Sequence, residues 1–178
     1  TKTPRDTMVH LMRGLRGTKV VLTIGRQLRQ IPFEITRDKI PETSIGAAFM
    51  VDATTGYIHL SKFARNTYLE FFTAAHKLCG EGMSRLILDL RDNTGGFFDQ
   101  ACNIANEFLP DKALIVYMQG LHRNREDVYS NGKGSLQKIE LSVLINDGSA
   151  SASEILAGAI QDNDRGEIIG RRSFGKGL

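Results

Sequence analysis

The chain lacks the features that mark several specialised classes of protein. It has only two cysteines in 178 residues and no tryptophan. It also has no run of about 18 apolar residues, which excludes a membrane-spanning helix. Two cysteines cannot form a disulfide framework, so Cys79 and Cys102 are expected to be buried thiols, with a single bridge open if the compartment is oxidising.

Metal-binding patterns and strong charge are missing too. The sequence has no CxxC pair, and its four histidines (His10, His59, His76, His122) are scattered rather than paired at ligand spacing. We therefore expect no metal and no cofactor. The net charge of +3 is too small to indicate nucleic-acid binding. A hydrophobic fraction of 41% and a charged fraction of 24% are typical of a globular protein and exclude disordered and fibrous classes.

The pattern along the chain divides it near residue 46. The first part predicts a helix over 7–14 and a strand at Lys19–Arg26, where Val20, Leu22 and Ile24 alternate with other residues. The polar stretch that follows carries two prolines and predicts a linker that holds a short strand at 33–36. The expected organisation is therefore a small piece over 1–27, a linker over 28–45 and a main domain over 46–178.

The main domain alternates strands with helices, which predicts an α/β fold with parallel β-α-β crossovers. Residues 121–134 are polar and predict an exposed loop or hairpin. The expected strands are 47–51, 57–60, 85–90, 113–119, 141–146 and 167–170, and the expected helices are 66–78, 97–108 and 151–161.

Three serines, Ser149, Ser151 and Ser153, stand where a strand gives way to a helix. Free N–H groups and the positive end of the helix dipole point at such a position. They would stabilise the oxyanion that an attacking serine creates. Taken alone, the segment favours the simpler interpretation, because a serine at a helix start is usually a helix cap.

Two glycine-rich loops could complete such a site. Gly95 and Gly96 follow a buried strand, and paired glycines there expose backbone N–H groups; the alternative is a tight strand-to-helix turn. Lys176 stands between two glycines and could act as a general base if it is buried and neutral; the alternative is an exposed turn lysine. No Walker-type lysine follows the first glycine pair, so nucleotide binding is disfavoured.

Three motifs occur in one order: LILDLRDNTGG, LINDGSASASEILAGAIQD and IIGRRSFGKG. Together they resemble the carboxy-terminal processing peptidases, also called tail-specific proteases. The resemblance runs from about residue 46 to the end, and residues 8–20 resemble the last helix and strand of the PDZ domain of these proteases. It implies a crotonase/ClpP-like β-β-α protease core preceded by a partial PDZ-like segment.

The resemblance also implies roles for individual residues. The family uses a Ser–Lys dyad with the lysine 25 positions after the serine, and this spacing assigns Ser151 as nucleophile and Lys176 as base. Oxyanion donors would be Ala152 and either Gly95 or Gly96. The implied activity is that of a serine endopeptidase that cleaves proteins near their C-termini without metal or cofactor. Substrates bound by their C-termini, a homo-oligomer and a periplasmic or cell-envelope location are implied as well.

Two other classes stay open. One is a catalytically silent relative that serves as a PDZ-type binding or scaffold module, and the other is an acyl-CoA enzyme of the crotonase type. Intact Ser151 and Lys176 disfavour the first, and the second offers no role for the lysine. The family's orienting glutamine, four residues after the lysine, and the front of its PDZ domain are absent from the sequence, so we expect a piece of a longer protein with little peptidase activity of its own.

Overall fold

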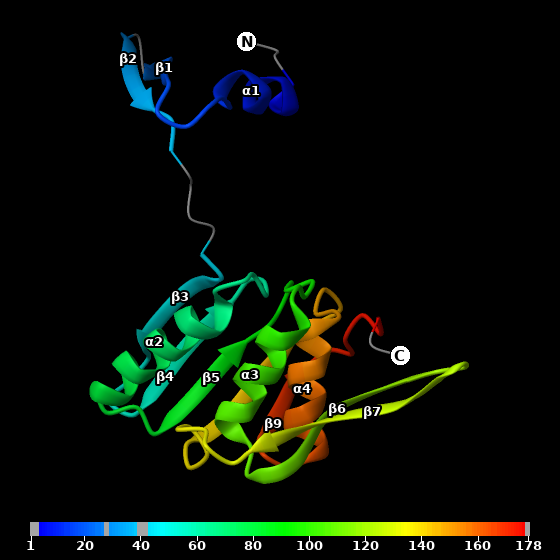
Figure 1. Cartoon of the computed structure of the whole chain (residues 1–178). Helices are drawn as coiled ribbons and strands as arrows, with labels where there is room; N and C mark the ends of the chain where they lie inside the picture. Colours follow the sequence, from blue (N-terminus) through cyan, green and yellow to red (C-terminus); the bar gives the residue numbers. More distant parts are fainter. Residues whose placement is uncertain (1–3, 27–28, 39–42, 177–178) are drawn as a thin grey trace. The chain divides into compact units, whose positions relative to one another are not determined.

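The computed structural model describes residues 4–26, 29–38 and 43–176 (Figure 1). The chain divides into two compact units, Thr1–Glu42 and Thr43–Leu178, and each is described by itself. Among the described residues, no helix is long and apolar enough to cross a membrane.

The first unit consists of helix α1 (Arg5–Met12) and a hairpin of strands β1 (Lys19–Arg26) and β2 (Arg29–Thr36). The predicted strand at Lys19–Arg26 is confirmed. The short strand expected at 33–36 exists, but it is longer than predicted: β2 begins at Arg29 and pairs with β1 along its whole length. Apolar cross-strand pairs, such as Leu22 with Phe33, explain the pairing. Pro32 indicated a break, yet it is tolerated in a hairpin whose outer edges carry no further strand in the described part of this unit.

The second unit is built on a five-stranded sheet in the order β3-β4-β5-β8-β9, counted over its described residues. Strand β3 (Ile45–Met50) runs antiparallel to β4 (Thr55–Leu60). The remaining neighbours are parallel: β4 with β5 (Arg85–Asp89), β5 with β8 (Glu140–Ile145), and β8 with β9 (Glu167–Gly170). The parallel β-α-β arrangement predicted from the sequence is therefore confirmed.

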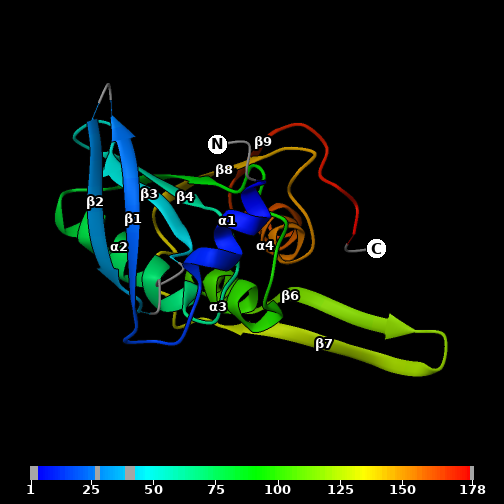
Figure 2. The ribbon, with the colours of Figure 1, turned by 90° about the horizontal axis from the view of Figure 1, so that it is seen from above.

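Helices α2 (Thr67–Gly80), α3 (Phe98–Phe108) and α4 (Ala152–Asp162) lie on one face of this sheet (Figures 1 and 2). Successive side chains of a strand point to opposite faces of the sheet, so every second side chain faces the helices. Those side chains form the core with the helices, and each large apolar one contributes about 1.5–3 kcal/mol. The fully or almost fully buried strand residues are Ile58, Leu60, Leu86, Leu88, Leu141 and Val143.

Strands β6 (Asp111–Gly120) and β7 (Arg123–Asn131) form a separate two-stranded hairpin. Its base packs on α3 and α4, and the rest extends away from the body of the unit (Figures 1 and 2). Of the two alternatives that the sequence left open for residues 121–134, a hairpin is the one observed. The expected strand at 113–119 exists, although it is not part of the main sheet.

The carboxyl ends of β5, β8 and β9 meet at one edge of the sheet because these strands are parallel. Three loops leave that edge, over residues 90–97, 146–151 and 171–176. These are the segments that the sequence motifs singled out. Ligands of open parallel sheets commonly bind at such an edge.

Candidate active site

Ser151 stands directly before α4 and has an unusual backbone conformation. Its φ is +56° and its ψ is −114°, a region that side-chain-bearing residues rarely adopt. Such a conformation costs about 1–3 kcal/mol and tends to persist at functional sites. The N–H of Ser151 donates to Glu154 Oε2 at 2.8 Å, and this contact stabilises the turn. The side chain of Ser151 is half-buried, so it remains accessible from solvent.

The two neighbouring serines are committed to the fold. Ser149 and Ser153 are both fully buried. The hydroxyl of Ser149 donates to the carbonyl of Leu90 at 2.8 Å, and that of Ser153 donates to the carbonyl of Asn93 at 2.8 Å. Both bonds tie the start of α4 to the loop after β5. Ser151 is therefore the one serine of this motif whose hydroxyl is not used to join these segments.

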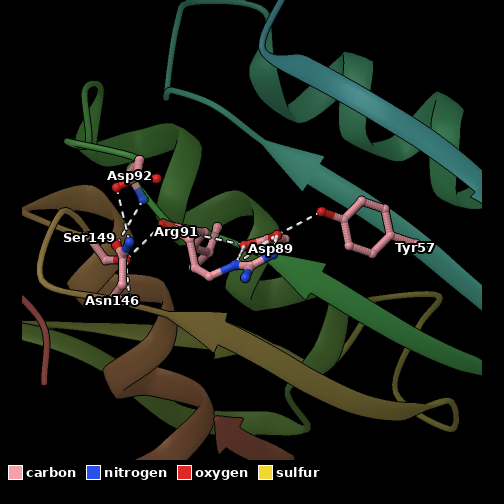
Figure 3. Close-up of polar contacts among 7 residues, drawn as sticks. Tyr57, Asp89, Arg91, Asp92, Asn146 and Ser149 are labelled. Carbon is pink, nitrogen blue, oxygen red and sulfur yellow. Dashed lines mark hydrogen bonds and ion pairs between the residues drawn. The ribbon is translucent and has the colours of Figure 1, made fainter. Parts of the chain in front are cut away.

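The loops after β5 and β8 are joined further by their polar side chains (Figure 3). Asp92 and Asn146 bond reciprocally: the Asp92 N–H donates to Asn146 Oδ1, and Asn146 Nδ2 donates to Asp92 Oδ1, both at 2.9 Å. The N–H of Ala150 also donates to the carbonyl of Asn93 at 3.0 Å. These bonds fix the glycine-containing loop beside the first turn of α4.

Gly95 makes the closest approach between the two loops. Its φ is +97°, and a Cβ added to it would lie 2.8 Å from Ser151 Cβ and 2.9 Å from the backbone nitrogen of Ala152. A side chain at this position would therefore overlap the candidate nucleophile. Gly96 lies against the backbone of Phe63, where a Cβ would lie 2.0 Å from the Phe63 carbonyl oxygen. Both glycines are needed for this close packing of backbone.

Two backbone N–H groups beside Ser151 have no acceptor within the described residues, those of Ala152 and Gly96. The N–H of Gly95 is engaged, because it donates to Asn93 Oδ1 at 2.9 Å. The carbonyl of Gly95 accepts a hydrogen bond from the N–H of Phe63 at 2.9 Å. In a trans peptide group the N–H points opposite to the carbonyl, so the N–H of Gly96 points away from the Phe63 backbone.

The loop that carries Lys176 returns to the same helix end. Oε1 of Glu154 accepts hydrogen bonds from the Gly175 N–H and the Ser173 hydroxyl, and Oε2 accepts one from the Lys176 N–H at 2.9 Å. The Lys176 side chain is exposed, so the burial expected of a neutral lysine is not found in this chain. Over the described ranges, no hydrogen bond joins Lys176 Nζ to Ser151 Oγ.

Glu154 is a residue of this site that the sequence reasoning missed. Burial alone would raise the pKa of this carboxyl, but hydrogen bonds from the N–H groups of Gly175 and Ser151 outweigh that effect and hold the pKa below its usual value. One carboxylate thus contacts both the serine turn and the lysine loop. The spacing Ser-x-x-Glu at a helix start is the signal that could have found it.

A second polar cluster joins the end of β5 to the middle of β4 (Figure 3). The side chain of Asp89 is only 3% exposed and forms an ion pair with Arg91 at 2.6 Å. The hydroxyl of Tyr57 donates to Asp89 Oδ2, also at 2.6 Å. Burial and the nearby Asp89 raise the pKa of Tyr57. These three residues line one wall of a cavity of about 570 Å³, together with His59, Asp92, Ile145, Asn146, Gly170 and Arg171.

Cys79 and Cys102 are both free thiols in this structure, and only Cys102 is buried. Burial raises the pKa of the Cys102 thiol to about 11, so it is not an activated nucleophile. Through the described ranges, no group of three or more histidine, cysteine or acidic side chains could hold a metal ion.

A strained serine at the start of a helix beside a paired-glycine loop is an arrangement that α/β hydrolytic enzymes use at a strand-to-helix junction. Comparisons with known proteins agree. The sequence profile of Peptidase family S41 matches residues 54–178. A carboxyl-terminal-processing protease of Synechocystis sp. is 42% identical over 179 residues, which cover 97% of this chain and 41% of that protein.

Other relatives give the same result. A protein of Staphylococcus epidermidis named "probable CtpA-like serine protease" is 35% identical over 177 residues, or 98% of this chain and 35% of that protein. The solved structure of the photosystem II D1 C-terminal processing protease aligns with a TM-score of 0.67 at 31% identity, over 92% of this chain and 46% of that one. The chain thus spans less than half the length of these relatives.

The chain belongs to peptidase family S41, a family of serine-type peptidases. The resemblance to carboxy-terminal processing peptidases is therefore confirmed, and the predicted α/β protease core is confirmed with it. The PDZ-like nature of the first unit, the boundaries at 27 and 45 and the roles of single residues remain predictions.

Proposed function

We propose that the protein containing this chain is a serine endopeptidase in which Ser151 is the nucleophile and Lys176 the general base. The proposal rests on the groups that surround Ser151. Its strained backbone stands beside two N–H groups, those of Ala152 and Gly96, that have no acceptor in the described part of the chain. Unused donors beside a nucleophile are what an oxyanion hole requires.

Of the two glycines, Gly96 is the better candidate for the second oxyanion donor. The N–H of Gly95 already donates to Asn93 Oδ1. Gly95 matters instead because it has no side chain, and this lets the peptide group between the two glycines approach Ser151 and Ala152. The proposed oxyanion hole therefore consists of the N–H groups of Ala152 and Gly96.

In the proposed reaction, neutral Lys176 takes the hydroxyl proton as Ser151 Oγ attacks the carbonyl carbon of a substrate peptide bond. The carbonyl oxygen becomes the oxyanion and binds the two N–H groups. Collapse of this intermediate breaks the C–N bond, and the protonated lysine gives its proton to the leaving amine. Water, deprotonated by the same lysine, then attacks the acyl-enzyme and releases the second product.

Lysine is the better candidate for the base because the histidines contact other parts of the chain. His59 lies against Gly46 of β3, and His76 pairs with the Ser135 hydroxyl at 3.1 Å. The backbone of Lys176, by contrast, shares the Glu154 carboxylate with Ser151. Its exposed side chain can reach the serine only if it turns inward, and substrate or further chain would have to exclude water there.

The substrates that fit this proposal are proteins recognised by their C-termini and cut near them. The family and the names of the relatives support this. The PDZ-like reading of the first unit, a homo-oligomeric assembly and an extracytoplasmic, periplasmic or envelope location belong to the same proposal. They rest on the sequence resemblance alone.

The test uses the full-length protein and its variants Ser151→Ala, Lys176→Ala and the double variant. A fluorophosphonate probe should label Ser151, and Ser151→Ala should lower kcat by about 10⁶-fold without lowering Tm. Because the two residues act as a unit, the double variant should be little worse than either single one. Full labelling and turnover in Ser151→Ala, or loss of activity in Ser149→Ala instead, would disprove the assignment.

A further inference from the structure

Asn93 lies between three segments that build the site, although it has no role in the reaction proposed above. It is fully buried in the loop after β5. Its side-chain Nδ2 donates to the carbonyl of Leu60, the last residue of β4, at 2.6 Å, and its Oδ1 accepts the N–H of Gly95 at 2.9 Å. Both ends of the side-chain amide are thus used, and each is bonded to backbone.

The backbone carbonyl of Asn93 reaches the other side of the site. It accepts the N–H of Ala150 at 3.0 Å and the hydroxyl of Ser153 at 2.8 Å. These two residues flank Ser151 in the sequence. Asn93 therefore bonds to the end of β4, to the glycine loop and to the start of α4 at once, and the segments it joins are those that position the nucleophile and the proposed oxyanion donor.

The glycine pair makes such a restraint necessary. Gly95 and Gly96 have φ values of +97° and +145°, and glycine exchanges readily among many backbone conformations. A rotation of the peptide group between them would turn the N–H of Gly96 away from the substrate oxygen. The hydrogen bond from the Phe63 N–H to the Gly95 carbonyl opposes that rotation directly. The bond from the Gly95 N–H to Asn93 Oδ1 holds the preceding peptide group, so Gly95 is restrained from both sides, and it also removes the Gly95 N–H as a competing donor.

We propose that Asn93 is a positioning residue of the oxyanion hole: its buried side chain binds the Gly95 N–H and, together with the hydrogen bond from the Phe63 N–H to the Gly95 carbonyl, holds the Gly96 N–H toward the oxygen of the tetrahedral intermediate. This inference rests on the proposed peptidase function. Asn93 does not contact the substrate in this proposal. Replacing it should therefore weaken binding of the transition state and leave substrate binding almost unchanged.

The first experiment measures the hydrogen bond between the Gly95 N–H and Asn93 directly, without reference to activity. Hydrogen exchange of the Gly95 amide is followed by NMR in the full-length protein and in Asn93→Ala, with Thr94→Ala as the matched control because Thr94 is an exposed neighbour in the same loop. Gly95 should exchange at least tenfold faster in Asn93→Ala and at the wild-type rate in Thr94→Ala. Unchanged exchange of Gly95 in a folded Asn93→Ala would overturn the proposal.

The second experiment separates positioning from general damage. A peptide boronic acid mimics the tetrahedral intermediate, whereas the free product peptide does not. In Asn93→Ala, kcat and the affinity for the boronic acid should both fall by about 10²-fold, with KM and product affinity changed by less than threefold. Asn93→Asp keeps an acceptor for the Gly95 N–H and should lie between wild type and Asn93→Ala.

The outcomes distinguish this inference from the function on which it rests. If the wild-type protein neither turns over peptides nor forms a boronate adduct at Ser151, the peptidase proposal fails, and the exchange rate of Gly95 still decides whether Asn93 restrains the loop. If the peptidase is active but boronate and product affinities fall equally in Asn93→Ala, Asn93 is merely structural and the inference is wrong.

Discussion

The loop after β5 and the loop after β9 both reach the first turn of α4, but different contacts hold them there. The first is bonded at several points, among them the exposed Asp92–Asn146 pair and the buried hydroxyls of Ser149 and Ser153. The second is bonded chiefly to one carboxylate, that of Glu154, and to the carbonyl of Ser149 through the N–H of Phe174 at 2.9 Å.

This difference separates the two halves of the proposed dyad. The nucleophile and the proposed oxyanion donors are held by a network of several hydrogen bonds, two of them from fully buried serine hydroxyls, so their positions change only if several bonds break together. The lysine loop depends on the ionisation of one half-buried group, and its side chain is exposed. A site of this kind can have its acyl-binding part preformed while its base is set in place by a later event, such as substrate binding.

The largest effect is expected from closing the gap between Gly95 and Ser151. In Gly95→Ala the new Cβ would lie 2.7 Å from the Ala150 carbonyl oxygen and 2.8 Å from Ser151 Cβ, at a φ of +97° that alanine disfavours. The loop and the serine turn must move apart, so kcat should fall by about 10³-fold. The control is Gly158→Ala in α4, where an added Cβ meets nothing within 4 Å. Similar turnover in the two variants would contradict the close-packed arrangement.

A smaller effect is expected on the lysine side. In Glu154→Gln one oxygen becomes an NH₂ group, which cannot accept. Either the N–H groups of Ser151 and Lys176 or the Gly175 N–H and the Ser173 hydroxyl then lose their acceptor. A displacement of about 1 Å can cost about 10²-fold in rate, and we expect a fall of about 10–10²-fold in kcat. Glu167→Gln, an exposed change at the start of β9, is the matched control. Steady-state peptide cleavage measures both; equal kcat values would show that Glu154 does not position the dyad.

The sequence indicated most of the elements of the main domain because their apolar pattern agrees with their final burial. The strands at Arg85 and Leu141 are short apolar runs, and both became interior strands of the parallel sheet. In β2 the expected strand at 33–36 exists, but residues 29–32 were not expected to belong to it, for the opposite reason. Pro32 and the flanking charges obscured an alternation whose apolar side chains are still exposed in the described unit, such as Phe33 at 47%.

The site was only partly visible in the sequence. Spacing and helix-start chemistry singled out Ser151, and the glycine pair stood out by composition. Asn93 and Glu154 did not. Each has one backbone partner nearby in the chain, Gly95 and Ser151 respectively, but their bonds to Leu60 and to the lysine loop join distant segments and are set by the fold rather than by local pattern. The choice between Gly95 and Gly96 likewise needed the orientation of a single peptide group.

Acid should weaken the lysine side before the nucleophile side. The pKa of Glu154 is held below its usual value of 4.5, so its hydrogen bonds stabilise the fold fully above that value and are lost as pH falls through the lowered pKa. The free energy of unfolding of wild type should therefore exceed that of Glu154→Gln at pH 7, and the difference should shrink below about pH 4.5. The lowered pKa of Asp89 is the same in both proteins, so its contribution cancels in the difference between their free energies of unfolding. Urea titrations from pH 7 to pH 3 measure this; a constant difference would contradict it.

The smallest effect on turnover is expected from Ser149→Ala, although it removes a fully buried hydrogen bond. The variant leaves the Leu90 carbonyl without the hydroxyl that it accepts from at 2.8 Å, which should lower the free energy of unfolding by about 1–3 kcal/mol. The Asp92–Asn146 pair and the Ala150–Asn93 bond still hold the loop beside α4, so kcat should change by less than threefold. Chemical denaturation and peptide cleavage are measured on the same preparation, with Thr94→Ala as a surface control. If kcat fell as far as in Glu154→Gln, the loop after β5 would be held no more firmly beside α4 than the loop that carries Lys176.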